Sequence, residues 1–249
     1  MRKWRNWQTH HLEGVAPTRR AGSSPAFRTK ESLARISKAF SLFCSLSLLD
    51  IRRTKFFATA AVLAALGGRG KLREHLRAAR SINWRRGAAE VFLQLHLFAG
   101  FPGAIEALNI LHSIDPKPPK RARPMSLRQR TVWGLKTCKM VYGSKFGSVQ
   151  AALRSLHPDL VWGMMQDGYG KVLSRGGLSL VERELINVAI LASLGWERQL
   201  RSHIIGSINV GAKSEEIREV LSAIRPFISP RRFRTAFAFV ETSGSRKRT

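Results

Sequence analysis

A helical hydrophobic repeat in the second half of the chain limits the possible fold more than any other feature. Ser179 and Glu182 have the spacing of a capping box, in which each side chain accepts a hydrogen bond from a free backbone N–H at a helix start. Gly195 is placed to end this helix. Between these signals, apolar residues recur at the spacing of one helix face: Val181, Leu185, Val188, Ala189 and Ala192.

Two further helices are predicted after the first. Leu200, Ile204 and Ile208 lie at helical spacing, and Gly211 ends their run. Ser214 is the predicted cap of the next helix, and the two glutamates after it favour the positive end of the helix dipole. Because strand signals are nearly absent from the sequence, the chain is predicted to be all-α.

The two halves of the chain have similar patterns, which indicates an internal duplication. Leu72 and His75 match Leu200 and His203 at an offset of 128 residues. A Glu-Val pair also recurs, at an offset of 129 residues. Each copy is predicted to be a small helical unit that needs partners to bury its apolar face.

The same patterns divide the chain into segments. A Pro-rich, basic stretch between the halves is typical of an exposed, extended linker. The predicted segments are an N-terminal extension (residues 1–30), a degenerate first repeat (31–114), the linker (115–130), the second repeat (131–241) and a basic tail (242–249).

The first 30 residues differ from the rest. His10, His11 and Glu13 are a weak metal pattern because no further ligand lies nearby, and we expect no metal site. The tryptophans and arginines around them are also compatible with a flexible nucleic-acid-binding arm. Codons compatible with residues 4–14 and 22–25 resemble, in order, the arms of a bacterial leucine tRNA gene. This favours a third interpretation, in which residues 1 to about 30 are a tRNA gene read as protein.

Charge and cysteine content limit the function classes and the compartment. The net charge of +27 is typical of chains that meet nucleic acid or another anionic surface. No RRM, KH, zinc-finger or helix-turn-helix signature is found, so a solvated basic surface is favoured over a nucleic-acid interface. Cys44 and Cys138 form no CxxC motif, which favours a reducing, cytoplasmic location.

The sequence predicts no membrane-spanning segment and no signal peptide at residue 1. The longest apolar run, residues 56–68, has 13 residues, whereas a spanning helix needs about 20. The start of the chain is polar and charged, unlike a signal sequence.

Glu184 and His203 are the main candidate functional residues. Glu184 lies near the apolar face of its predicted helix, where a carboxylate must be paired or used because burying it alone is costly. His203 follows Leu200 on the next helix, and a hairpin through Gly195 can bring the two side chains together. Such a pair suits general acid or base catalysis, and it is also compatible with a purely structural ion pair.

Three segments carry a resemblance to a known family. Residues 168–221, which run from GYGKVLSRGGLSLVERELINVAI to EEIREVL, resemble the carboxymuconolactone decarboxylase family. AEVFLQLHLFAGFPGAIEAL at 89–108 resembles a later helix of the same family with its Gly-x-Pro turn, and ALRSLHPDLVWGMMQDGYGKVLSR resembles members of this group. The resemblance covers most of residues 45–240 and implies an all-α fold of alkylhydroperoxidase D-like units.

The wider superfamily includes thiol hydroperoxidases with the pattern Glu-x11-Cys-x2-Cys-x3-His. Counted from Glu184, that pattern places Trp196 and Gln199 at the cysteine positions and His203 at the last position. Because a thiolate attacks the peroxide and neither side chain replaces it, thiol peroxidase activity is not expected. Cys138 lies elsewhere and is expected to be a buried structural thiol.

The resemblance implies a cofactor-free decarboxylation of a small, carboxylated lactone. In this interpretation His203 donates a proton to carbon, Glu184 orients it, and Arg201 or Arg198 receives a carboxylate of the anionic substrate. Phe56 stands where the first copy would carry the glutamate, so that copy is structural or completes a composite site. Homo-oligomers are also implied.

A rival hypothesis is a non-catalytic, basic helical module that binds nucleic acid or an acidic partner. The Glu184 and His203 pair favours the enzyme, whereas the charge favours the binding module.

Overall fold

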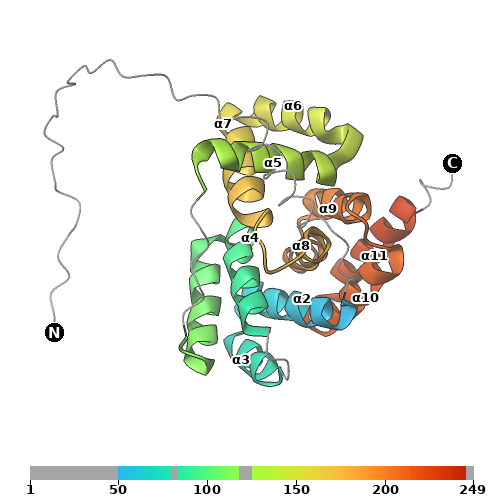
Figure 1. Ribbon diagram of the computed structural model, residues 1–249. Coiled ribbons are helices and arrows are strands. Elements are labelled where there is room, and N and C mark those ends of the chain that lie inside the picture. The colour runs from blue at the N-terminus through green and yellow to red at the C-terminus, as the bar shows by residue number, and fades with distance from the viewer. Residues whose placement is uncertain (1–49, 80–83, 118–124, 245–249) are drawn as a thin grey trace, which may run out of the picture. The chain divides into compact units, whose positions relative to one another are not determined.

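The computed structural model describes residues 50–79, 84–117 and 125–244, which all belong to a compact unit formed by residues 41–249. The described residues form helices and contain no strand, so the predicted all-α fold is confirmed (Figure 1). The predicted N-terminal extension, with His10, His11 and Glu13, lies outside the described residues, as do Cys44 and the last five residues of the tail.

The first half forms three helices: α2 (Ile51–Ala65), α3 (Arg69–Arg77) and α4 (Trp84–Ile114). The Asp50 side chain caps α2 by accepting hydrogen bonds from the backbone N–H groups of Arg52 and Arg53. Within α4, Gly100 has a non-helical φ of 71°, so the Gly-Phe-Pro turn divides this helix into two parts.

Helix α4 is the one described helix whose length and composition would allow it to cross a membrane. This differs from the sequence-based expectation, which considered the shorter run at 56–68. The break at Gly100 interrupts α4, and Val91, Phe92 and Leu95 of its first part are buried in the main hydrophobic core. These features are those of a core helix.

The middle of the chain forms a second helical group. It comprises α5 (Leu127–Tyr142), the 3₁₀ turn Gly143–Lys145, α6 (Phe146–Leu156), α7 (Pro158–Trp162) and a π-helical segment, Gly163–Leu173. Helix α5 begins inside the segment predicted to be an extended linker. The reason is a second capping box, in which Ser126 and Gln129 satisfy each other's backbone N–H groups.

The last four helices are α8 (Leu180–Leu194), α9 (Glu197–Asn209), α10 (Ser214–Ile224) and α11 (Pro230–Gly244). The predicted capping box of Ser179 and Glu182 is present at the start of α8. The prediction that Ser214 caps α10 is wrong by one residue, because the helix already includes Ser214 and the cap residue is Lys213. The Lys213 N–H donates to the Glu216 carboxylate over 2.7 Å.

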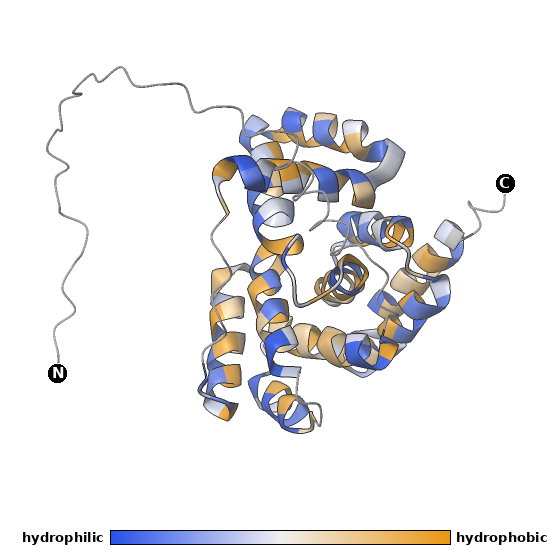
Figure 2. Ribbon diagram, viewed as in Figure 1, coloured by the Kyte–Doolittle hydropathy of each residue, from blue (hydrophilic) through white to orange (hydrophobic). Residues whose placement is uncertain are grey.

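Helix α8 lies at the centre of the main core. It packs against α2, α4, α9, α10 and α11, and nearly all of its residues from Leu180 to Ser193 are buried (Figure 1). The helices around α8 carry both hydrophobic and hydrophilic residues along their length (Figure 2), as expected for helices with one buried face. Any charged or polar side chain on α8 therefore meets other protein groups rather than bulk solvent.

Candidate functional site

Glu184 of α8 and His203 of α9 are in direct contact. Gly195 ends α8 in the left-handed conformation, with φ of 79°, which reverses the chain so that α9 packs against α8. The Glu184 Oε2 atom lies 2.7 Å from Nδ1 of His203. The Glu184 side chain is fully buried, and that of His203 is 10% exposed. A buried carboxylate thus fixes the orientation of an imidazole that remains partly accessible.

Gly206 provides the space that this pair needs. It lies three residues after His203, on the same side of α9. A Cβ atom at position 206 would lie 3.1 Å from Glu184 Oε2 and 2.7 Å from a methyl carbon of Val141 on α5. A side chain here would push on both the carboxylate and the neighbouring helix.

Two buried amides continue the contacts of Glu184. Asn187 Nδ2 donates to Glu184 Oε1 over 3.2 Å, and Gln94 Nε2 donates to Asn187 Oδ1 over 2.6 Å. Gln94 lies on α4, in the first half of the chain, and the guanidinium of Arg183 donates to its side-chain oxygen over 2.9 Å. All four side chains belong to residues with no solvent exposure.

Glu90 balances the charge of Arg183. Its carboxylate accepts hydrogen bonds from Arg183 Nη2 over 3.0 Å and from two nitrogens of Arg175 over 2.7 and 2.9 Å. Burial alone would raise the pKa of Glu90, but the Arg175 hydrogen bonds and the Arg183 charge outweigh it, so this pKa lies below its usual value. Arg183 is therefore a buried cation with a stable counter-charge.

A second, smaller core lies beside the pair and contains Cys138, Tyr142 and Tyr169. The Tyr169 hydroxyl lies 3.1 Å from that of Tyr142. Burial, with a smaller contribution from the Glu184 charge, raises the pKa of both tyrosines, so their hydroxyl groups keep their protons. Burial likewise raises the pKa of the Cys138 thiol, the opposite of what a reactive thiolate requires.

Arg201 and Arg198 are exposed residues of α9. The Arg201 guanidinium lies 5.6 Å from the centre of the Phe239 ring on α11. With 3.6 residues per turn, the two arginines are displaced from His203 by about 160° and about 140° around the helix. The structure thus brings His203 together with Glu184 and not with these arginines, whose carboxylate-binding role stays a prediction.

Trp196 and Gln199, at the positions of the superfamily thiols, are both exposed. Trp196 precedes the first residue of α9 and has 57% of its surface exposed. The described residues contain no group of three or more His, Cys, Asp or Glu side chains placed to hold a metal ion.

The first half contains a histidine in the corresponding place. His75 Nε2 lies 2.9 Å from the backbone oxygen of Phe56, and the rings of these two residues are stacked 4.4 Å apart. Desolvation lowers the pKa of His75, with the Phe56 hydrogen bond opposing it. His75 thus contacts a neutral carbonyl where His203 contacts a carboxylate.

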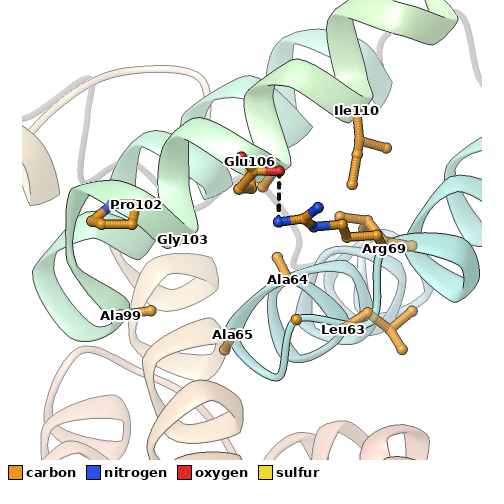
Figure 3. Close-up of a pocket in the computed structure, with 12 residues that line it drawn as sticks. Leu63, Ala64, Ala65, Arg69, Ala99, Pro102, Gly103, Glu106 and Ile110 are labelled. Carbon is orange, nitrogen blue, oxygen red and sulfur yellow. Dashed lines mark ion pairs between the residues drawn. The ribbon is translucent and has the colours of Figure 1, made fainter.

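A pocket of about 220 Å³ lies in the first half, between α2, α3 and the second part of α4 (Figure 3). Arg69 and Glu106 face each other across it and form an ion pair of 3.2 Å. The pocket is smaller than the usual range of about 300–1,000 Å³ for ligand sites, and neither Glu184 nor His203 lines it. It is therefore separate from the candidate site.

Sequence reasoning missed the buried network around Glu184, although it left a signal. Glu90 and Gln94 are four residues apart on α4, and Arg183 and Asn187 are four residues apart on α8. Side chains at this spacing share one helix face. Two such polar pairs on otherwise apolar helices indicate faces that meet, but the sequence does not say which helix faces which.

Comparisons with known proteins agree with this geometry. The model of the carboxymuconolactone decarboxylase family matches residues 158–242, a segment that contains both Glu184 and His203. The chain is also similar to 4-carboxymuconolactone decarboxylase of Acinetobacter baylyi, with 32% identity over 100 residues. This match covers 39% of the present chain and 73% of the relative. The chain therefore belongs to the carboxymuconolactone decarboxylase family.

Proposed function

We propose that the protein is a cofactor-free acid–base lyase that removes CO₂ from a small, carboxylated lactone. The observation that carries this proposal is the buried contact of 2.7 Å between Glu184 Oε2 and His203 Nδ1, next to a partly accessible imidazole. Membership of the family and the similarity to a named decarboxylase support the choice of reaction class.

The reaction needs two events. The bond between the carboxylate carbon and the ring breaks, CO₂ leaves, and the electron pair spreads onto the lactone carbonyl oxygen. His203 then gives the proton on Nε2 to the ring carbon, and the imidazole regains a proton from solvent. Glu184 holds the ring through Nδ1 and balances the positive charge of the imidazolium.

The remaining features are also proposals. A basic side chain receives the substrate carboxylate, for which Arg201 and Arg198 are the sequence-based candidates. The two halves are proposed to be tandem copies. Their first helices, α2 and α8, have 15 residues each, and the His75–Phe56 contact occupies the place of the His203–Glu184 contact. We also propose a cytoplasmic homo-oligomer.

The test is decarboxylation of 4-carboxymuconolactone by purified protein. The variant His203→Gln should lose about 10²- to 10⁴-fold in kcat, the range typical of a general acid, while keeping the helical content of the wild type. His75→Gln is the matched control, because His75 contacts a neutral carbonyl, and its kcat should stay within about twofold of wild type. An unchanged rate in His203→Gln would reject the assignment.

A further inference from the structure

A chain of buried hydrogen bonds begins at Arg183 and ends at His203. It passes through Gln94, Asn187 and Glu184, with donor–acceptor distances of 2.9, 2.6, 3.2 and 2.7 Å in order. The first four residues have no solvent exposure. Water therefore cannot replace a member of the chain, and each side chain must satisfy its neighbours directly.

The direction of this chain is fixed at its first member. A guanidinium only donates hydrogen bonds, so the Gln94 atom that faces Arg183 Nη1 must be the amide oxygen. The Gln94 amide nitrogen then points the other way. Its two hydrogens are directed to Asn187 Oδ1 and to the backbone oxygen of Arg183, at 2.6 and 3.0 Å. Two acceptors and one donor thus hold the Gln94 amide in one orientation.

The second amide passes this direction to the carboxylate. Because Asn187 Oδ1 accepts from Gln94, its amide nitrogen must face Glu184 and donate to Oε1. Oε1 is therefore an acceptor, and a proton shared between Glu184 and His203 can lie only between Oε2 and Nδ1. Among the described residues, His203 Nε2 has no hydrogen-bond partner.

We propose that Gln94 and Asn187 are positioning residues, which transmit the donor character of Arg183 to Glu184 and so hold neutral His203 as the Nδ1–H tautomer with Nε2 available for proton exchange. The catalytic consequence rests on the proposed function. Helix α4 of the first half thereby contributes to the site on α8 and α9, and Glu90 keeps Arg183 charged and in place.

The tautomer of the wild-type protein is the direct test. In protein labelled with ¹⁵N-histidine, the resonances of His203 are identified among the seven histidines by their loss in His203→Gln. We expect Nδ1 to show the shift of a protonated ring nitrogen and Nε2 that of an unprotonated one when the ring is neutral. A neutral ring protonated at Nε2 in the folded wild-type protein would overturn the proposal without any variant.

Gln94→Glu should reverse the direction of the chain. The new carboxylate accepts from Arg183, and it also accepts from Asn187, whose amide must then turn its oxygen toward Glu184. We expect the Nε2–H tautomer of His203 to increase, with a change in the pH profile of kcat and a fall in kcat of about tenfold to a hundredfold, within the range of general-acid catalysis.

Gln94→Met introduces no charge, removes the orientation of Asn187 and should give a mixture of tautomers. Gln166→Glu is the matched control, because the Gln166 amide donates to Thr131 over 3.0 Å outside this chain, and the His203 spectrum should stay as in wild type. If folded Gln94→Glu or Gln94→Met keeps the wild-type tautomer ratio, Gln94 is merely structural and the proposal fails.

The spectrum and the rate separate this proposal from the proposed function. If the wild type shows the Nδ1–H tautomer and Gln94→Met loses it, the positioning role stands, even when no decarboxylation is detected. If decarboxylation depends on His203 but the tautomer ignores Gln94, the reaction stands and the positioning role falls.

Discussion

At the scale of single residues, the site depends on a position that has no side chain. Gly206 lies where α9 approaches α5 and Glu184, and the nearest atoms are 2.7 and 3.1 Å from the place of a Cβ. Real Cβ atoms do not approach carbon this closely, so any substitution must move Val141 or the carboxylate. The residue acts by leaving room for the Glu184–His203 contact.

Gly206→Ala should therefore destabilise the protein by about 1–3 kcal/mol, the usual cost of an overpacked core. The measurement is urea unfolding followed by far-UV circular dichroism. Gly147→Ala is the matched control, because Gly147 is helical and its Cβ would meet nothing within 4 Å. There, alanine should stabilise by about 0.5–1 kcal/mol through its higher helix propensity. Equal effects of the two variants would contradict the close approach at position 206.

At the scale of elements, α4 and α8 meet through polar side chains as well as apolar ones. Glu90 and Gln94 on α4 face Arg183 and Asn187 on α8. A buried charge such as Arg183 is costly to leave alone, so this interface specifies one register of the two helices. The ion pair joins the first half of the chain to the second.

This ion pair makes stability depend on pH. Because the folded-state pKa of Glu90 is lowered, its contribution is fully present above the unfolded value of about 4.3 and is lost as the pH falls through the folded-state value. Glu90→Gln should cost about 3–5 kcal/mol at pH 7, since it leaves Arg183 buried without its counter-charge. The difference between variant and wild type should shrink as the pH falls below about 4.

Urea unfolding at a series of pH values measures this difference. Glu106→Gln is the control, because Glu106 forms an exposed ion pair with Arg69 and should contribute less than about 1 kcal/mol at any pH. A Glu90→Gln effect that does not change between pH 7 and pH 3.5 would contradict the assigned role of the ion pair.

At the scale of the whole molecule, the charge of +27 dominates long-range behaviour. Several acidic residues are already paired with arginine or lysine, including Glu90, Glu182 and Glu219. The unbalanced basic charge therefore attracts polyanions without any groove-reading element, and it also attracts an anionic substrate.

We expect binding to duplex DNA that is independent of sequence and strongly sensitive to salt. The dissociation constant for unrelated 30-base-pair duplexes should agree within a few-fold and rise by about 10³-fold or more between about 50 and 200 mM salt. Fluorescence anisotropy measures both. Tight, sequence-selective binding that persists at 200 mM salt would instead favour the hypothesis of a binding module.

The sequence predicted much of the fold and part of the site. The capping box at Ser179 and the apolar spacing on α8 are local, and local signals read well without tertiary contacts. The start of α5 was missed because the surrounding prolines and basic residues favoured a linker. Arg201 shows the reverse problem, since a cation near His203 in the sequence lies on another face of the helix.

By itself, then, the sequence determined the helices, the family resemblance and the two residues of the central pair, because each depends on spacing along one chain segment. The tertiary structure decided that Gln94 of the first half completes the surroundings of Glu184, and that Gly206 leaves the space for it. These contacts join residues up to 93 positions apart. Their geometry follows from how α4, α5, α8 and α9 pack, which no local pattern in the chain specifies.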